Sequence, residues 1–154
     1  MVFGIQLLGA TSLIQGYKDR FYDLKQGDNT SICEYDIDLN EIDCIAIDIK
    51  PLAIYVGFNQ VIALSKTKAV ALDFMRKKIK WTILFKNAHK IHLNYPVVLI
   101  LKKSKQLVAY DFFTGLKLWE KPTSYLTFYE SGIDVWAYKN NGLYKIDLIS
   151  SDVV

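Results

Sequence analysis

The segment from Asp36 to Asp43 is the first place where residue types and spacing could bind a metal ion. It reads Asp-Ile-Asp-Leu-Asn-Glu-Ile-Asp, which begins like a calcium loop of alternating oxygen ligands. The pattern then fails, because Glu41 stands where the loop needs glycine and Ile47 stands where it needs a final glutamate. The segment is therefore predicted to be a solvated turn between two structural units, and no metal site is assigned.

The two histidines, His89 and His92, could in principle hold a metal ion or carry a proton. They lie three residues apart on a predicted strand, so their side chains point to opposite faces and cannot share a metal ion. His89 also lies in a polar stretch where surface exposure is expected. The sequence shows no Gly-rich phosphate loop, nucleophile elbow or Ser/His/Asp order. No catalytic residue, cofactor-binding residue or cofactor is therefore predicted.

Cys33 and Cys44 are the only cysteines, and they form neither a C-x-x-C motif nor a Cys/His cluster with zinc spacing. The favoured interpretation is two reduced, buried thiols in a cytoplasmic protein. The alternative is a disulfide, because both residues lie on neighbouring predicted strands. Residues 1–17 lack the basic start of a signal peptide. No apolar run is long enough for a membrane helix, so no membrane partner is expected.

The positive charge is concentrated in the middle of the chain. Residues 65–121 hold 13 Lys/Arg and 3 Asp/Glu, a net charge of +10, whereas residues 1–64 carry −5 and residues 122–154 carry −2. Five lysines at two equivalent hairpin turns are predicted to form one basic ridge: Lys66, Lys68, Lys102, Lys103 and Lys105. The ridge is interpreted either as a solubilising rim or as the electrostatic footprint of a nucleic acid or an acidic protein.

An eleven-residue pattern that occurs twice, 38 residues apart, indicates which elements position these side chains. Residues 71–81 read ALDFMRKKIKW, and residues 109–119 read AYDFFTGLKLW. A fixed period near 40 residues is typical of a repeat fold. The residues that define the repeat are Asp73, Trp81, Asp111, Thr114, Gly115 and Trp119.

Each repeat is predicted to contain a turn between two strands. Asp111 is expected to cap the backbone N–H groups of this turn, and Gly115 is expected to take a positive φ. Asp73 and Asp111 are therefore interpreted as turn caps, not as a pair of catalytic carboxylates. The segment from Tyr22 to Gly27 has the same form, and the segment around Asp147 is a weaker copy.

These copies predict an all-β fold, a propeller-like array of about four four-stranded antiparallel blades in a single domain spanning residues 1–154. The units are expected at residues 2–40, 43–87, 90–122 and 124–154. The first unit is expected to begin with a strand near Gly4–Leu8, and the last to end with a poor strand at Asp152–Val154. Cys44–Ile49 is then a surplus strand that could join either of the first two units. Abundant Ile, Val and aromatic residues agree with a strand-rich fold.

One segment also fits a helix. Ser65 or Thr67 could cap a helix at residues 65–80, where apolar residues recur at helical spacing. Its alignment with residues 103–118, where Thr114-Gly115 would break a helix, favours strand–turn–strand instead.

The pattern Ala109-x-Asp111-x-x-Thr114-Gly115-x-x-x-Trp119 resembles the β-propeller repeat of the quinoprotein (PQQ-dehydrogenase-like) superfamily. The resemblance implies that Trp119 and Trp81 pack between adjacent blades and that Asp111, Thr114 and Gly115 form the turn joining two outer strands. It covers the third unit well and the second less well. The first and fourth units have no Trp eight residues after the Asp. The metal site and acidic catalytic residue of quinone enzymes are not recognisable, so the resemblance implies the fold and not the chemistry.

The predicted function is a non-catalytic protein-interaction scaffold. An open array of four blades would leave two apolar end faces larger than a typical monomer exposes. These faces are expected to be covered by a partner protein or a second copy of the chain, with a homodimer favoured over a hetero-complex. Two alternatives stay open: a nucleic-acid-binding protein that uses the basic ridge, and a diverged enzyme with an inter-blade pocket.

Overall fold

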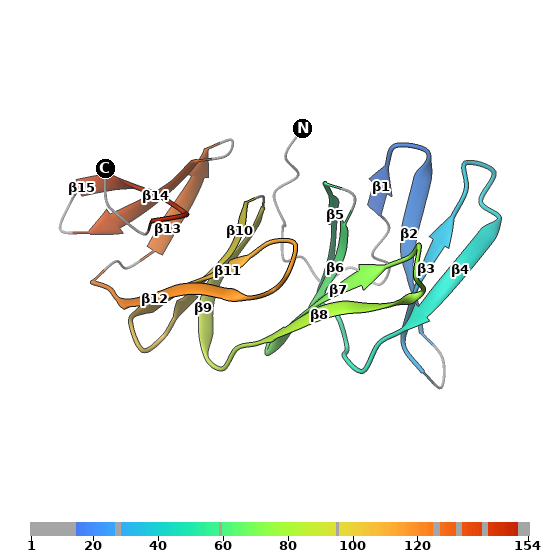
Figure 1. Ribbon diagram of the computed structural model, residues 1–154, viewed down its shortest axis with the longest axis horizontal. Coiled ribbons are helices and arrows are strands. Elements are labelled where there is room, and N and C mark those ends of the chain that lie inside the picture. Colours follow the sequence, from blue (N-terminus) through green and yellow to red (C-terminus); the bar gives the residue numbers. More distant parts are fainter. Residues whose placement is uncertain are drawn as a thin grey trace. The chain divides into compact units, whose positions relative to one another are not determined.

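The computed structural model describes residues 15–26, 29–58, 60–94, 96–124, 127–131, 134–139 and 142–150, and these residues form antiparallel β-sheets joined by turns (Figure 1). The described residues form four sheets with neighbouring strands consecutive in sequence. The chain divides between Leu84 and Phe85 into two compact units, each described here separately. Within the described ranges there is no helix long and apolar enough to span a membrane.

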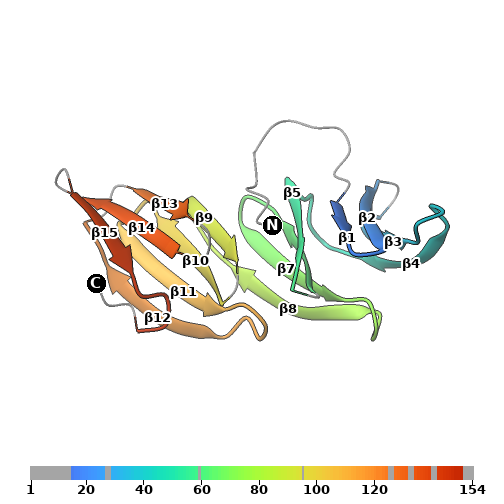
Figure 2. The same cartoon turned by 90° about the horizontal axis from the view of Figure 1, so that it is seen from above.

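The first unit contains two four-stranded sheets (Figures 1 and 2). One sheet consists of β1 (Gln15–Tyr17), β2 (Arg20–Lys25), β3 (Ser31–Tyr35) and β4 (Glu41–Ala46). The other consists of β5 (Ala53–Gly57), β6 (Gln60–Leu64), β7 (Lys68–Asp73) and β8 (Lys78–Leu84). A shared apolar core joins the two sheets, and Ile32, Ile45, Val61 and Val70 are among its buried residues.

The second unit contains one four-stranded and one three-stranded sheet among its described residues. The first consists of β9 (Ala88–Asn94), β10 (Val97–Lys102), β11 (Gln106–Asp111) and β12 (Lys117–Pro122). The second consists of β13 (Thr127–Ser131), β14 (Asp134–Lys139) and β15 (Gly142–Ile146). Leu99, Ala109, Val135 and Ala137 are fully buried in the core between these sheets.

The predicted fold class is confirmed, since the structure is all-β and consists of propeller-like antiparallel sheets. The helical alternative at residues 65–80 is wrong, because β7 and β8 occupy this segment and pair with each other. The prediction of a surplus strand also needs correction. Residues 41–46 form β4, which pairs with β3 and completes the first sheet, so the expected boundary near residues 40–43 falls inside that sheet. The strands expected at Gly4–Leu8 and Asp152–Val154 lie outside the described residues, and the single-domain organisation stays a prediction.

An aspartate marks the end of the third strand in every sheet. Asp36, Asp73, Asp111 and Asp147 lie at intervals of 37, 38 and 36 residues, and each accepts hydrogen bonds from backbone N–H groups two to four residues further on. Hydrogen bonds lower the pKa of Asp36, and the largest contribution comes from the Asn40 side chain. They also lower the pKa of Asp147, where the largest contribution comes from the backbone N–H of Ser150. The repeated element is therefore an Asp-capped turn.

The prediction that the first copy of this turn lies at Tyr22–Gly27 is wrong. Asp23 lies inside β2, where its side chain accepts a bond from the next backbone N–H, of Leu24. The equivalent residue is Asp36, at the start of the calcium-like segment. Its carboxylate accepts the N–H groups of Asp38 and Asn40 and the Asn40 side-chain amide. The segment is thus the β3–β4 turn inside the first sheet, not a connection between units.

Three of the four Asp-capped turns contain a residue with positive φ. Gly115 has a φ of 69°, and the corresponding residues after Asp36 and Asp73 are Leu39, with a φ of 63°, and Lys77, with a φ of 54°. A side chain with a Cβ disfavours this conformation, whereas glycine adopts it readily. The first two turns therefore hold a conformation for which their own residues are poorly suited.

We expect the substitution Leu39→Gly to raise the free energy of unfolding by about 0.5–1 kcal/mol. The relief of the left-handed conformation outweighs the greater entropy of glycine in the unfolded chain, and Leu39 is 70% exposed, so little burial is lost. Urea unfolding followed by circular dichroism measures the change. The matched control is Ile37→Gly, an exposed residue of the same turn that has no positive φ. Equal destabilisation of both variants would contradict the prediction.

Candidate functional site

The five lysines of the predicted basic ridge lie at two separate hairpin turns, one in each unit. Lys66 and Lys68 lie at the β6–β7 turn of the first unit, and Lys102, Lys103 and Lys105 lie at the β10–β11 turn of the second unit. Each turn joins the second and third strands of its sheet, which is the equivalence expected from the repeat.

Two of these five lysines form ion pairs with carboxylates of their own unit. Lys68 Nζ lies 2.6 Å from Asp48 Oδ2, and Lys102 Nζ lies 2.9 Å from Glu120 Oε1. The Lys68 contact lowers the pKa of Asp48, and contacts with Lys102 and then Lys117 lower the pKa of Glu120. Both carboxylates therefore stay charged and offset part of the positive potential. Among the residues that the structure describes, Lys66, Lys103 and Lys105 are exposed and have no ion pair.

The repeat tryptophans occupy equivalent register positions. Trp81 pairs with Ala71 and Trp119 pairs with Ala109, and in both sheets the register shifts immediately after this pair. Trp81 is buried, with 7% of its surface exposed. Trp119 is half-buried, packs against the core of the second unit, and donates its indole N–H to the Leu148 carbonyl over 3.1 Å. Trp119 therefore links the sheet of β9–β12 to the segment that follows β15.

The first sheet carries a different pair at the same position. Glu34 pairs with Asp43, and the register shifts directly after this pair, as it does after Ala71–Trp81 and Ala109–Trp119. The Asp43 carboxylate forms an ion pair with Lys77 Nζ over 2.9 Å, and this contact lowers the pKa of Asp43. Lys77 lies in the β7–β8 turn of the next sheet. An ion pair thus replaces the tryptophan as the link between these two sheets.

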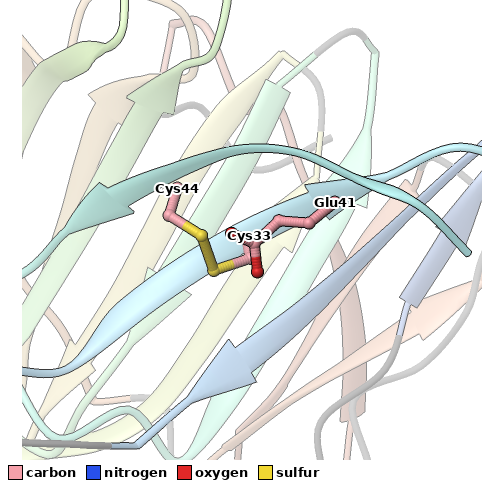
Figure 3. Close-up of side chains that lie close together, drawn as sticks. All are labelled: Cys33, Glu41 and Cys44. Carbon is pink, nitrogen blue, oxygen red and sulfur yellow. A yellow bond between two sulfur atoms is a disulfide. The ribbon is translucent and has the colours of Figure 1, made fainter.

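The two cysteines are joined as a disulfide between directly opposite residues of β3 and β4, so the expectation of two reduced thiols is wrong (Figure 3). Cys33, Cys44 and Glu41 bring their sulfur and oxygen atoms within 4.8 Å of one another. Two points argue against a metal site. Structural zinc takes four ligands as thiolates, imidazoles or carboxylates, whereas these sulfurs are bonded together. The Glu41 carboxylate already accepts a bond of 2.9 Å from Lys25 Nζ.

The disulfide lies on the face of the first sheet that points away from its core. Asp23 is directly opposite Cys33, and Tyr35 is directly opposite Glu41, so these side chains share one face with Cys44. Phe21 is directly opposite Tyr35, so this face carries aromatic as well as charged side chains beside the disulfide.

The two histidines differ in burial. His92 is buried, with 1% of its surface exposed, and pairs with Leu99 of the core of the second unit. His89 is exposed and lies at a register shift of β9.

The sheet of β13–β15 presents an aromatic face opposite its core. Val135 and Ala137 are fully buried in the core, so the alternating residues Trp136 and Tyr138 point to the other face. Tyr129 is directly opposite Trp136, and Leu143 is directly opposite Tyr138. Tyr129 is 54% exposed and Leu143 is 60% exposed. We call Tyr129, Trp136, Tyr138 and Leu143 the aromatic face.

Charged side chains of both signs border the aromatic face. Lys145 is directly opposite Trp136, and its ammonium lies 3.0 Å from the Asp134 carboxylate on β14. Lys90 of β9 places its ammonium 5.3 Å from the centre of the Tyr129 ring, within the range of a cation–π interaction. Aromatic residues surrounded by polar groups are typical of protein–protein contact surfaces. The sequence contained a signal for this face, since the alternation Val-Trp-Ala-Tyr in β14 places large apolar residues on both sides of the strand.

Comparison with known proteins supports the fold alone. No protein-family model and no curated protein matches the sequence. Among solved structures, BamB from Moraxella catarrhalis, a PQQ-like β-propeller protein, aligns with a TM-score of 0.60 at 14% identity over 88% of this chain and 48% of its own. The computationally designed protein Ika8 aligns with a TM-score of 0.58 at 12% identity over 86% of this chain and 44% of its own. The designed protein Ika4 aligns with a TM-score of 0.59 at 14% identity over 94% of this chain and all of its own.

The chain thus spans about half the length of BamB and Ika8. The predicted resemblance to the quinoprotein propeller repeat is confirmed at the level of the fold.

Proposed function

We propose that the protein is a non-catalytic interaction scaffold whose aromatic face binds a second copy of the chain. The observation that supports this proposal is the exposure of Tyr129 and Leu143 beside Trp136 and Tyr138 on one sheet face. Burial of such a face stabilises association, because aromatic side chains contribute large apolar areas and few rotamers.

The composition of this face suits contact with itself. In a two-fold symmetric dimer the same patch is used by both subunits, so it must be self-complementary. Lys145 and Asp134 border the aromatic face as an ion pair, so two copies facing each other can exchange the partners of this pair. The face around the disulfide of the first sheet also carries an aromatic pair, Phe21 opposite Tyr35, but both are half-buried, whereas Tyr129 and Leu143 are exposed.

We expect the wild-type protein to be a dimer of twice its 17.7 kDa mass at micromolar concentration, with a buried interface of at least about 1,000 Å2. Light scattering across a dilution series measures the mass. Leu143→Glu should weaken dimerisation at least tenfold, because it places a charge at the centre of the contact. The matched control is Leu116→Glu, at a residue of the same unit that is 68% exposed but lies in the β11–β12 turn. It should leave the mass unchanged.

A strictly monomeric and stable wild-type protein would refute binding of a second copy at this face. An equal loss of association in the Leu143→Glu and Leu116→Glu variants would refute the assignment to the aromatic face. The non-catalytic part of the proposal is tested separately with hydrolase and redox substrate panels. A robust turnover that one point mutation abolishes would overturn it.

A further inference from the structure

A cavity of about 420 Å3 lies between the two sheets of the first unit. Residues of β2, β3, β5, β6, β7 and β8 line it, together with the β1–β2 and β7–β8 turns. The cavity therefore belongs to one compact unit and is separate from the aromatic face of the second unit. Ligand sites of proteins usually have volumes of about 300–1,000 Å3, so this cavity has room for a small molecule.

One part of the cavity wall is apolar. Val56, Val61, Leu72 and Phe74 contribute to it, and the Phe74 ring lies 5.3 Å from the ring of Tyr22. An aliphatic or aromatic group placed here would be removed from water, which is worth about 25 cal/mol per Å2 of apolar surface. The wall thus favours a ligand with an apolar body.

Three carboxylates line the cavity, those of Asp19, Glu34 and Asp73, and the last two already have partners. Glu34 accepts a bond of 3.1 Å from the Tyr22 hydroxyl and lies 3.6 Å from Arg20 Nε. Burial and then the Glu34 charge raise the pKa of Tyr22, so its hydroxyl stays a donor to Glu34. Asp73 accepts the backbone N–H of Arg76 in the repeat turn and lies 3.8 Å from the Arg76 guanidinium. Neither Glu34 nor Asp73 is well placed to attract a cationic ligand.

The guanidinium of Arg20 has more N–H donors than its contact with Glu34 uses. Its contact with Glu34 is made through Nε, and within the described residues Arg20 forms no ion pair with a second carboxylate. The Arg20 side chain is 40% exposed and lines the cavity. Two parallel N–H groups of a guanidinium match the two oxygens of a carboxylate.

We propose that this cavity binds a small amphipathic carboxylate, with the acid on the outer guanidinium nitrogens of Arg20 and the apolar body against Val56, Val61, Leu72 and Phe74. The same chemistry is offered by a free acid and by the C-terminal carboxylate of a peptide that ends in an apolar residue. The site goes beyond the proposed scaffold function and does not depend on it.

The probe that tests the proposal is 3-phenylpropionate, added to 15N-labelled full-length protein and followed by two-dimensional NMR. We expect shifts of the amides around the cavity and a dissociation constant of about 1 mM, as for a fragment of this size. The uncharged analogue 3-phenylpropanol has the same apolar body and should bind at least tenfold more weakly. Equal binding of the alcohol, or no shift with either compound, would overturn the proposal.

Variants of Arg20 test its role directly. Arg20→Gln should weaken 3-phenylpropionate binding at least tenfold, and Arg20→Lys should recover part of it, because lysine restores the charge but not the paired donors. The control is Lys50→Gln, which removes a positive charge from the exposed β4–β5 connection of the same unit, at a residue that does not line the cavity. It should leave binding unchanged. Circular dichroism melting shows that each variant is folded, and unchanged binding by folded Arg20→Gln would refute the assignment.

A second pair of probes distinguishes the two sources of the carboxylate. An acetylated tripeptide ending in a free phenylalanine carboxylate is compared with the same peptide ending in an amide. Binding of the acid and not the amide supports a peptide C-terminus as the ligand. Binding of 3-phenylpropionate without either peptide supports a free acid. Equal binding of both peptides would contradict recognition of the carboxylate.

Discussion

Substitution of Trp119 by alanine is expected to lower the free energy of unfolding by about 3 kcal/mol, near the lower end of the range for tryptophan truncation. The indole packs against the core that contains Leu99, Ala109 and Val135, and its N–H donates to the Leu148 carbonyl over 3.1 Å. The truncation therefore removes apolar contacts and leaves a carbonyl without this donor. Because Trp119 is only half-buried, the loss should not reach the upper end of the range. Urea unfolding followed by circular dichroism measures it.

Two further variants separate the contributions of Trp119. Trp119→Phe keeps most of the ring but loses the N–H, so it should cost about 1 kcal/mol, the usual net value of one hydrogen bond. Leu118→Ala changes the neighbouring residue, which is 44% exposed, and should cost less than about 0.5 kcal/mol. If Trp119→Ala and Leu118→Ala had equal effects, the indole would have no role in joining the sheets.

The second and third sheets could be predicted from sequence because both retain the Ala, Asp and Trp of the repeat. The same reasoning failed for the first sheet, where Glu34 and Asp43 occupy the positions of the Ala–Trp pair. An ion pair between Asp43 and Lys77 replaces the packed indole there. A pattern based on Trp cannot detect this exchange, since the two solutions share no side-chain chemistry. The element that the four sheets share is the Asp-capped turn.

The turn of the first sheet was also hidden by its composition. Gly115 signals a positive φ in the third sheet, but Leu39 and Lys77 adopt the same conformation without a sequence signal. Leucine and lysine rarely adopt a positive φ and do so only where the rest of the structure imposes it, so their presence in a sequence does not predict this turn. The regular spacing of the aspartates indicates this turn, whereas the residues that follow Asp36 favoured its interpretation as the start of a calcium-like loop.

The candidate sites depended on contacts between distant segments, which limited what could be predicted. The positions of Lys66 and Lys103 at equivalent turns followed from the repeat, whereas the ion pairs of Lys68 with Asp48 and of Lys102 with Glu120 did not. The cavity beside Arg20 is lined by six strands, so no local pattern could reveal it.

The other large effect is expected from the disulfide. The double variant Cys33→Ala/Cys44→Ala should lower the free energy of unfolding by about 3 kcal/mol, because the bond closes a short loop and restricts the unfolded chain. The two cysteines are separated by 11 residues in sequence and lie directly opposite each other on β3 and β4. The neighbouring ion pair of Lys25 with Glu41 is largely exposed and contributes little. Urea unfolding of the wild-type protein with and without reductant supplies the comparison.

Reductant should destabilise the wild-type protein to the level of the double variant and should leave the variant itself unchanged. This pattern separates the covalent bond from the loss of the two sulfur atoms themselves, since reduction removes only the bond. Thiol titration of the unfolded, unreduced protein should find no free thiol. Two free thiols, or a double variant as stable as the wild type, would contradict the pairing. The expectation of a cytoplasmic protein used the reduced thiols beside the missing basic start of a signal peptide, and disulfides persist mainly in oxidising compartments. The thiol titration therefore also tests one premise of that expectation.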